Sequence, residues 1–219
     1  MVLTLPNLLT LLRLFAAPGV LLAFVLLPRP AADWTALGLF VVAAATDWVD
    51  GHLARRWGQV TKLGTMLDPI ADKLLVVVAL LAVCGYAGMP PLLVIPATAI
   101  LFREVFVSGL REFLGATAGT LRVTRLAKWK TTVQMLALAV LLGRGIAEHH
   151  LGMLVFGLGE AMAVDIFEGR VEDVVGLGRL AHLEAGLAWG GTALIWLAAV
   201  LTLATGWDYY SKARPFLRD

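Results

Sequence analysis

Long apolar runs separated by short polar, glycine- or proline-bearing segments dominate the chain. A helix needs about 20 predominantly apolar residues to cross a bilayer. On this pattern we expect six membrane-spanning helices, at about 11–27, 34–46, 65–86, 92–114, 131–146 and 185–205. The pattern therefore predicts an all-α, polytopic membrane protein.

The composition supports this expectation. Of the 219 residues, 59% are hydrophobic and 16% are charged, and the mean hydropathy is +0.83, whereas soluble domains have about half apolar and about a quarter charged residues. The single cysteine, Cys84, lies in an apolar run and is expected to be a small buried side chain rather than part of a disulfide. We expect one membrane domain over residues 1–219.

The distribution of basic residues predicts the orientation. Six spans place both termini on one side of the membrane. With these six spans, four of the 18 lysines and arginines fall on the opposite side: Arg29, Arg144, Arg170 and Arg179. By the positive-inside rule, we expect both termini to be cytoplasmic. The expected location is the inner (cytoplasmic) membrane, with several spans.

The segment 147–184 is too long for a turn and too interrupted by glycines and acids for a full span. We expect it to form interfacial helices on the far side of the membrane. His149 and His150, beside Glu148, are either solvated loop residues or part of a metal site.

Four carboxylates stand between two strongly apolar segments: Asp47, Asp50, Asp68 and Asp72. Carboxylates at membrane depth are costly unless cations neutralise them. The first two are spaced i,i+3 and the last two i,i+4, so each pair projects from one helix face. An all-oxygen set suits Mg²⁺ or Mn²⁺, and we expect two such ions.

Small residues accompany the carboxylates at positions where a ligand could approach the backbone: Gly51, Ala54 and Gly64. Arg55 adds a guanidinium fork suited to phosphate. The stretch therefore predicts a diphosphate-handling site that opens to the cytoplasm; the alternative is a set of solvated loop charges.

These residues form the pattern D-x2-D-G-x2-A-R-x8-G-x3-D-x3-D, which resembles that of the CDP-alcohol phosphotransferase family at every fixed position. The resemblance implies transfer of a phosphatidyl or similar group from a CDP-linked donor to an alcohol, with release of CMP. The stretches PNLLTLLR, FREVFVSGLREF and KWKTTVQM resemble the bacterial phosphatidylglycerophosphate synthases of this family. This implies CDP-diacylglycerol as donor, glycerol 3-phosphate as acceptor, a homodimer, and no nucleic-acid partner.

The resemblance and the charges together suggest roles for the candidate residues. Asp47, Asp50 and Asp68 are expected metal ligands; Asp72 is the expected general base and a further ligand. The expected donor-binding residues are Asn7, Thr10, Gly51, Ala54, Arg55, Thr61 and Gly64. Helix capping is the alternative for Asn7 and Thr10. The candidates for the acceptor phosphate are Arg103, Arg111, Arg125 and Lys128, with contact to anionic lipid as their alternative.

Three alternatives remain open at this point. The same motif could serve another acceptor: phosphatidylglycerol in cardiolipin synthesis, inositol phosphate, or serine. A divalent-cation transporter could also place aspartates between helices, although two repeated halves would then be expected and the sequence has one copy of the motif. A catalytically inactive scaffold would be expected to lack an aspartate, and all four are present.

Overall fold

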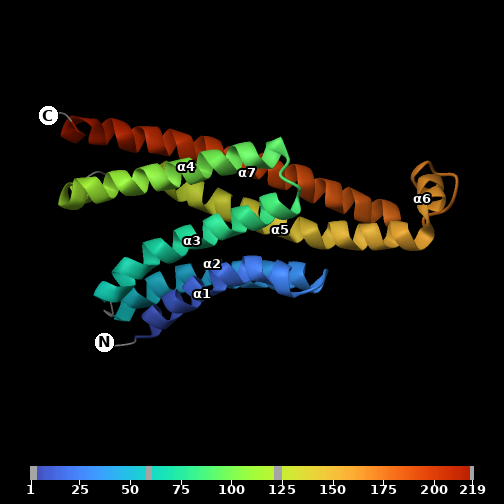
Figure 1. The fold of residues 1–219 in the computed structure, drawn as a ribbon, viewed down its shortest axis with the longest axis horizontal. Helices are drawn as coiled ribbons and strands as arrows, with labels where there is room; N and C mark the ends of the chain where they lie inside the picture. Colours follow the sequence, from blue (N-terminus) through green and yellow to red (C-terminus); the bar gives the residue numbers. More distant parts are fainter. Residues whose placement is uncertain (1–3, 58–60, 121–124, 218–219) are drawn as a thin grey trace. The chain divides into compact units, whose positions relative to one another are not determined.

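The computed structural model describes residues 4–57, 61–120 and 125–217; within these ranges it describes every side chain except those of residues 6, 47–57, 116, 120, 125, 127 and 128. All elements in the described part of the chain are helical (Figure 1), which confirms the all-α prediction. In chain order they are α1 (Leu5–Leu26), α2 (Ala31–Trp57), α3 (Lys62–Tyr86), α4 (Pro91–Leu114), η1 (Gly115–Thr120), α5 (Arg125–Leu158), α6 (Glu160–Phe167), α7 (Leu177–Ala213) and η2 (Arg214–Leu217).

Four helical stretches among the described residues are long and apolar enough to cross a membrane: Asn7–Leu26, Pro91–Leu114, Trp129–Leu158 and Leu177–Leu217. The chain is therefore a multi-pass membrane protein. The predicted second span coincides with a shorter apolar stretch, Ala31–Thr46, and the predicted third span lies within α3. Six spans with cytoplasmic termini thus stay a prediction.

The helices group into two compact units. Unit 1 comprises Met1–Ala82 and Ala139–Gly191, and unit 2 comprises Val83–Leu138 and Thr192–Asp219. Unit 1 contains α1, α2, most of α3, the second part of α5, α6 and the first part of α7. Unit 2 contains α4, η1, the first part of α5 and the last part of α7. The single membrane domain over residues 1–219 stays a prediction.

Helix α1 begins six residues before the predicted span. The Thr4 side chain accepts a hydrogen bond from the backbone N–H of Asn7 at 3.4 Å, so Thr4 is the N-cap, and a proline stands in the first turn. A capping hydroxyl and a first-turn proline both favour a helix start. The helix therefore takes in Asn7 and Thr10 of the PNLLTLLR stretch, which precede the predicted span.

The segment 147–184 differs from the expected set of interfacial helices. Residues 147–158 continue α5, residues 177–184 belong to α7, and only Glu160–Phe167 forms a separate short helix. Within unit 1, Arg144 Nε on α5 donates to Glu184 Oε1 on α7 at 2.7 Å, so these charges pair with one another and do not end the helices. The location of this segment on the far side stays a prediction.

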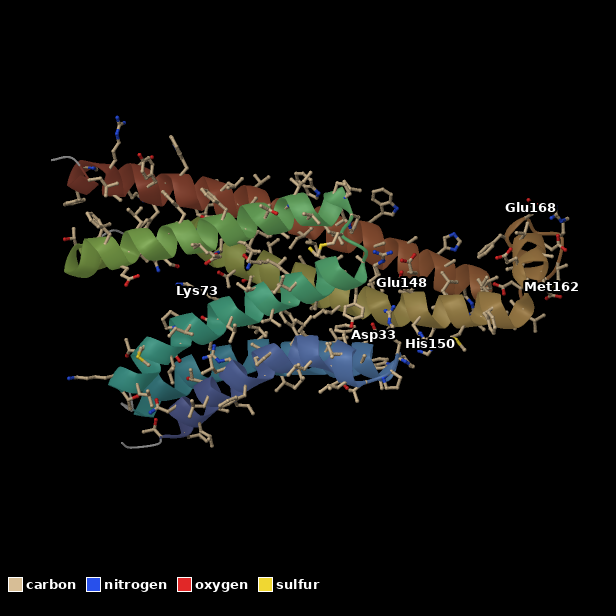
Figure 2. The ribbon with its side chains drawn as sticks, in the orientation of Figure 1. Asp33, Lys73, Glu148, His150, Met162 and Glu168 are labelled. Carbon is tan, nitrogen blue, oxygen red and sulfur yellow. The ribbon has the colours of Figure 1, made fainter. Side chains whose placement is uncertain are left out.

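A second polar contact in unit 1 joins the turn before α2 to α5. Arg29 donates to both carboxylate oxygens of Asp33, at 2.8 and 2.7 Å, and to the backbone oxygen of Gly145 at 2.9 Å. A Cβ on Gly145 would lie 2.5 Å from Asp33 Oδ1, so only glycine permits this approach. Figure 2 shows Asp33 on α2 and Glu148 on α5; Glu148 is 4.0 Å from Arg29. This contact fixes α5 against α2.

The sequence also led to expectations about Cys84 and about the pair His149 and His150. Cys84 is buried and free, as expected. His149 and His150 lie on α5, not in a loop, with their ring centroids 5.9 Å apart. The loop placement was therefore wrong for this pair.

Candidate functional site

Three polar side chains lie along one face of the apolar helix α1. Asn7, Thr10 and Arg13 are spaced i, i+3 and i+6, and all three are buried. This spacing aligns side chains on one helix face. Each contacts a residue just before α3 or in its first half, in the same order along the chain, so the two helices run in the same direction where they meet.

The first of these contacts involves Asn7. The Thr61 hydroxyl donates to Asn7 Oδ1 at 2.7 Å and accepts from the backbone N–H of Gly64 at 3.0 Å. Thr61 therefore acts as a cap on α3 and as a link to α1. A Cβ on Gly64 would lie 2.9 Å from Asn7 Oδ1 and 3.3 Å from Thr61 Oγ1, so the motif glycine allows the close approach of the two helices.

The second contact involves Thr10, whose hydroxyl donates to Asp68 Oδ1 at 2.8 Å. Because Thr4 is the cap of α1, the capping alternative is wrong for the side chains of Asn7 and Thr10. Both side chains point to the motif instead. Their contact with a bound donor stays a prediction.

The third contact is an ion pair that sequence reasoning missed. The Arg13 side chain is 1% exposed; its Nη1 donates to Asp72 Oδ1 at 2.6 Å and its Nη2 lies 3.5 Å from Asp68 Oδ1. A buried guanidinium between apolar residues requires such partners. The sequence signal for this role is the position of Arg13 three residues after Thr10, on the same helix face. The positive-inside rule uses such a basic residue only to predict orientation.

The two carboxylates remain accessible on their other side. The side chains of Asp68 and Asp72 are 48% and 46% exposed, although α1 contacts both. They lie one helical turn apart on α3, as their i,i+4 spacing predicts. This arrangement is a pair of anchored carboxylates that can accept a cation or a proton.

The first half of the motif lies on α2, which extends to Trp57, so the expected end of this helix near Thr46 was too early. Asp47 and Asp50 therefore lie on a helix, at the expected i,i+3 spacing. Their side chains lie outside the described residues, as do those of Ala54 and Arg55. Gly51 also falls in this stretch, and the predicted roles of all five stay predictions.

The two predicted metal ligands whose side chains the structure describes fit a divalent cation. Asp68 and Asp72 offer carboxylate oxygens, the ligands that Mg²⁺ and Mn²⁺ prefer. Among the side chains that the structure describes, no group of three or more His, Cys, Asp or Glu residues could hold a metal. The side chains of the other predicted ligands, Asp47 and Asp50, are not among those that the structure describes.

Unit 2 contains the candidates for acceptor binding. Arg103 is largely buried, with 13% of its side chain exposed, whereas Arg111 is exposed and lies over the ring of Tyr209, 5.1 Å from its centroid. The side chains of Arg125 and Lys128 lie outside the described residues. The roles of all four residues in acceptor binding stay predictions.

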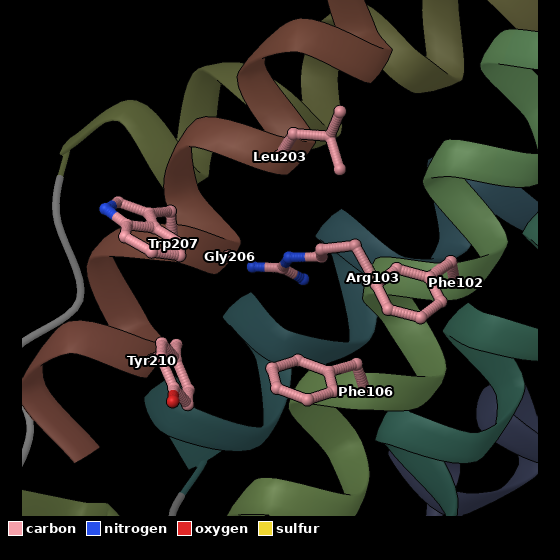
Figure 3. Close-up of a pocket in the computed structure, with 7 residues that line it drawn as sticks. All are labelled: Phe102, Arg103, Phe106, Leu203, Gly206, Trp207 and Tyr210. Atoms are coloured by element: carbon pink, nitrogen blue, oxygen red, sulfur yellow. The ribbon is translucent and has the colours of Figure 1, made fainter. Parts of the chain in front are cut away.

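A pocket of about 510 Å³ adjoins Arg103 in unit 2 (Figure 3). Aromatic side chains from α4 and α7 form most of its wall, and the Arg103 side chain extends among them. Its lining residues are Phe102, Arg103, Phe106, Leu203, Gly206, Trp207 and Tyr210. Arg103 is therefore the one acceptor candidate among the residues that line this pocket.

Comparison with known proteins agrees with the motif. The family model described as CDP-alcohol phosphatidyltransferase matches residues 3–171. A protein of Cereibacter sphaeroides named CDP-diacylglycerol--glycerol-3-phosphate 3-phosphatidyltransferase is 55% identical over 99% of this chain and 98% of its own length. Proteins of the same name from Escherichia coli (strain K12) and Rickettsia bellii are 35% and 34% identical, over 98% and 97% of this chain and 97% and 96% of their own lengths. These matches confirm the resemblance recognised in the sequence.

Proposed function

Because this chain belongs to the CDP-alcohol phosphatidyltransferase family, we propose that it transfers the phosphatidyl group of CDP-diacylglycerol to glycerol 3-phosphate, giving phosphatidylglycerophosphate and CMP. The near full-length similarity to proteins named for this reaction supports the choice of substrates. The observation that carries the proposal is the set of contacts through which α1 holds Asp68 and Asp72 side by side. A transferase family also argues against the transporter alternative.

In the proposed reaction, a hydroxyl oxygen of glycerol 3-phosphate forms a bond to the phosphorus that carries the diacylglycerol. The bond from that phosphorus to the CMP oxygen breaks, and CMP leaves with the bonding electrons. Asp72 takes the proton of the attacking hydroxyl. Arg13 holds one oxygen of Asp72 at 2.6 Å, which restricts the rotation of the carboxylate and so fixes its direction.

We assign divalent ions, Mg²⁺ or Mn²⁺, to Asp47, Asp50, Asp68 and Asp72. When bound, such ions would neutralise the diphosphate and stabilise the charge that develops on CMP. The protein's part is to hold the ligands in place: Thr10 orients Asp68 by a hydrogen bond of 2.8 Å, and Arg13 offsets part of the charge of the carboxylate pair.

The remaining roles complete the proposal. Gly51, Ala54, Arg55, Thr61 and Gly64, with Asn7 and Thr10, bind the donor. Arg103, Arg111, Arg125 and Lys128 hold the acceptor phosphate, because guanidinium forks match phosphate oxygens. The site faces the cytoplasm, where CMP is released, and the enzyme is a homodimer of the inner membrane.

An acceptor panel tests the proposed function. The purified chain is given CDP-diacylglycerol and Mg²⁺ with one acceptor at a time, and released CMP and the lipid product are measured. We expect rapid CMP release with glycerol 3-phosphate and a phosphatidylglycerophosphate product. Faster turnover with phosphatidylglycerol, inositol phosphate or serine would assign the chain to another reaction of the same family.

A further inference from the structure

A largely buried carboxylate in unit 2 holds two cations at once. Glu104 on α4 accepts through Oε1 from Arg103 Nη1 at 3.1 Å and from the Lys130 ammonium on α5. All three side chains are at most 15% exposed. Neither Glu104 nor Lys130 was a predicted site residue.

Among the described side chains, the charges of this cluster do not cancel. Arg103 and Lys130 share the single negative charge of Glu104, and Arg111 lies near enough to interact with both cations. An excess of positive charge in a membrane helix bundle is costly unless an anion binds there. The cluster is thus suited to an anionic ligand, and a phosphate group is the anion that the proposed acceptor carries.

The packing around Arg103 also restricts its position. A Cβ on Gly206 of α7 would lie 2.8 Å from Arg103 Cγ, so the absence of a side chain there makes room for the arginine stem. Thr205 Oγ1 lies 3.5 Å from Nη2, and Nε is buried without a hydrogen-bond partner among the described groups. The guanidinium therefore has donor capacity beyond its contact with Glu104.

We propose that Glu104 is a positioning residue: by holding Arg103 and Lys130 at a fixed spacing, it presents both cations to the phosphate of the acceptor. This inference rests on the proposed function and adds Lys130 to the cations of the acceptor site. A positioning role differs from charge balance alone. If Glu104 only balanced the positive charge of the cations, its removal would strengthen the binding of an anion. A positioning role predicts the opposite.

The test measures steady-state kinetics with glycerol 3-phosphate in Glu104→Asp, which keeps the charge on a side chain too short to contact both cations. We expect the KM for glycerol 3-phosphate to rise about 10-fold, the factor for one lost charged hydrogen bond, with the KM for CDP-diacylglycerol unchanged. Glu104→Gln should also raise the KM for glycerol 3-phosphate. Glu112→Gln, an exposed position on the same helix, is the control and should match the wild type.

A second variant tests the position of Arg103 without changing any charge. Gly206→Ala should displace the arginine stem and raise the same KM, whereas Gly190→Ala on α7, where a Cβ meets nothing within 4 Å, should not. This pair decides the question if Glu104→Asp does not fold. Wild-type KM in Glu104→Asp and Gly206→Ala, a lower KM in Glu104→Gln, or a loss of kcat alone would overturn the inference. Wild-type protein that is inactive with glycerol 3-phosphate would instead overturn the proposed function.

Discussion

Arg13 on α1 donates to Asp72 on α3 over 2.6 Å, and the same guanidinium lies 3.5 Å from Asp68. The planar fork of an arginine can contact two carboxylates one helical turn apart, which a single ammonium cannot do in the same geometry. The position of the carboxylate pair therefore depends on a helix that lies outside the aspartate motif.

Replacing this fork should impair catalysis. Arg13→Lys keeps the charge but loses a contact, and we expect kcat for CMP release to fall about 10-fold or more, since a charged hydrogen bond contributes about 1.5–3 kcal/mol. Leu12→Ala, at an exposed position of α1, is the control and should retain activity. Full activity of Arg13→Lys would show that Asp72 needs no partner on α1.

The motif glycine offers a steric test of the contact between α1 and α3. Gly64→Ala should lower Tm and CMP release together, because its Cβ would lie 2.9 Å from Asn7 Oδ1; overpacking of this kind costs about 1–3 kcal/mol. The matched control is Gly85→Ala on the same helix, where a Cβ meets nothing within 4 Å. Alanine in an open helical position is neutral or stabilising, so an equal loss in both variants would contradict the steric account.

The i,i+4 spacing of Asp68 and Asp72 correctly predicted a carboxylate pair one turn apart on a helix, whereas the roles of the two residues stay predictions. The sequence did not predict Arg13 as a site residue, since hydropathy treats a basic residue near a terminus as a topology signal. Only the spatial contact of α1 with α3 identifies its partners. The PNLLTLLR resemblance pointed to the correct stretch without assigning this role.

The lengths of α5 and α7 could not be read from hydropathy for a related reason. Glycines and charges in 143–158 lower the apolar signal, but a helix tolerates glycine at a cost of about 1 kcal/mol each. Arg144 on α5 then pairs with Glu184 on α7. Because these residues are 40 positions apart, no local pattern reveals that each compensates the other.

Asp173 precedes α7 and lies outside the candidate membrane spans, and it provides a pH-dependent prediction. Hydrogen bonds from the backbone N–H groups of Gly178 and Leu177 hold the pKa of Asp173 below its ordinary value. Since the folded pKa is below the unfolded one, the stabilisation is present above the unfolded pKa of about 3.9 and is lost as pH falls through the folded pKa.

We therefore expect Asp173→Ala to lower Tm at pH 7, with a difference from wild type that shrinks below about pH 4 as the wild-type carboxylate becomes protonated. Thermal unfolding in detergent across pH 3–8 measures this. The neighbouring Glu172→Ala is the control, because Glu172 is exposed. A Tm difference that stays constant down to pH 3 would mean that the charge of Asp173 has no part in capping.

Removal of divalent ions should stop the reaction. In excess chelator we expect CMP release to cease and to return with Mg²⁺ or Mn²⁺, because the carboxylates alone would repel a diphosphate. Asp68→Asn should show the same loss with metal present, while its far-UV circular dichroism stays that of the wild type. Turnover that persists in chelator would exclude the metal assignment.

The most direct test of the account is the separation of donor binding from transfer in Asp72→Asn. The amide keeps the size of the side chain and an oxygen for Arg13, but it cannot accept the proton of glycerol 3-phosphate. Equilibrium binding of CDP-diacylglycerol and CMP release are measured on the same preparation. We predict that binding stays near the wild-type value while transfer falls by about 10²–10⁴-fold; wild-type transfer, or an equal collapse of donor binding, would contradict the role of Asp72 as the base.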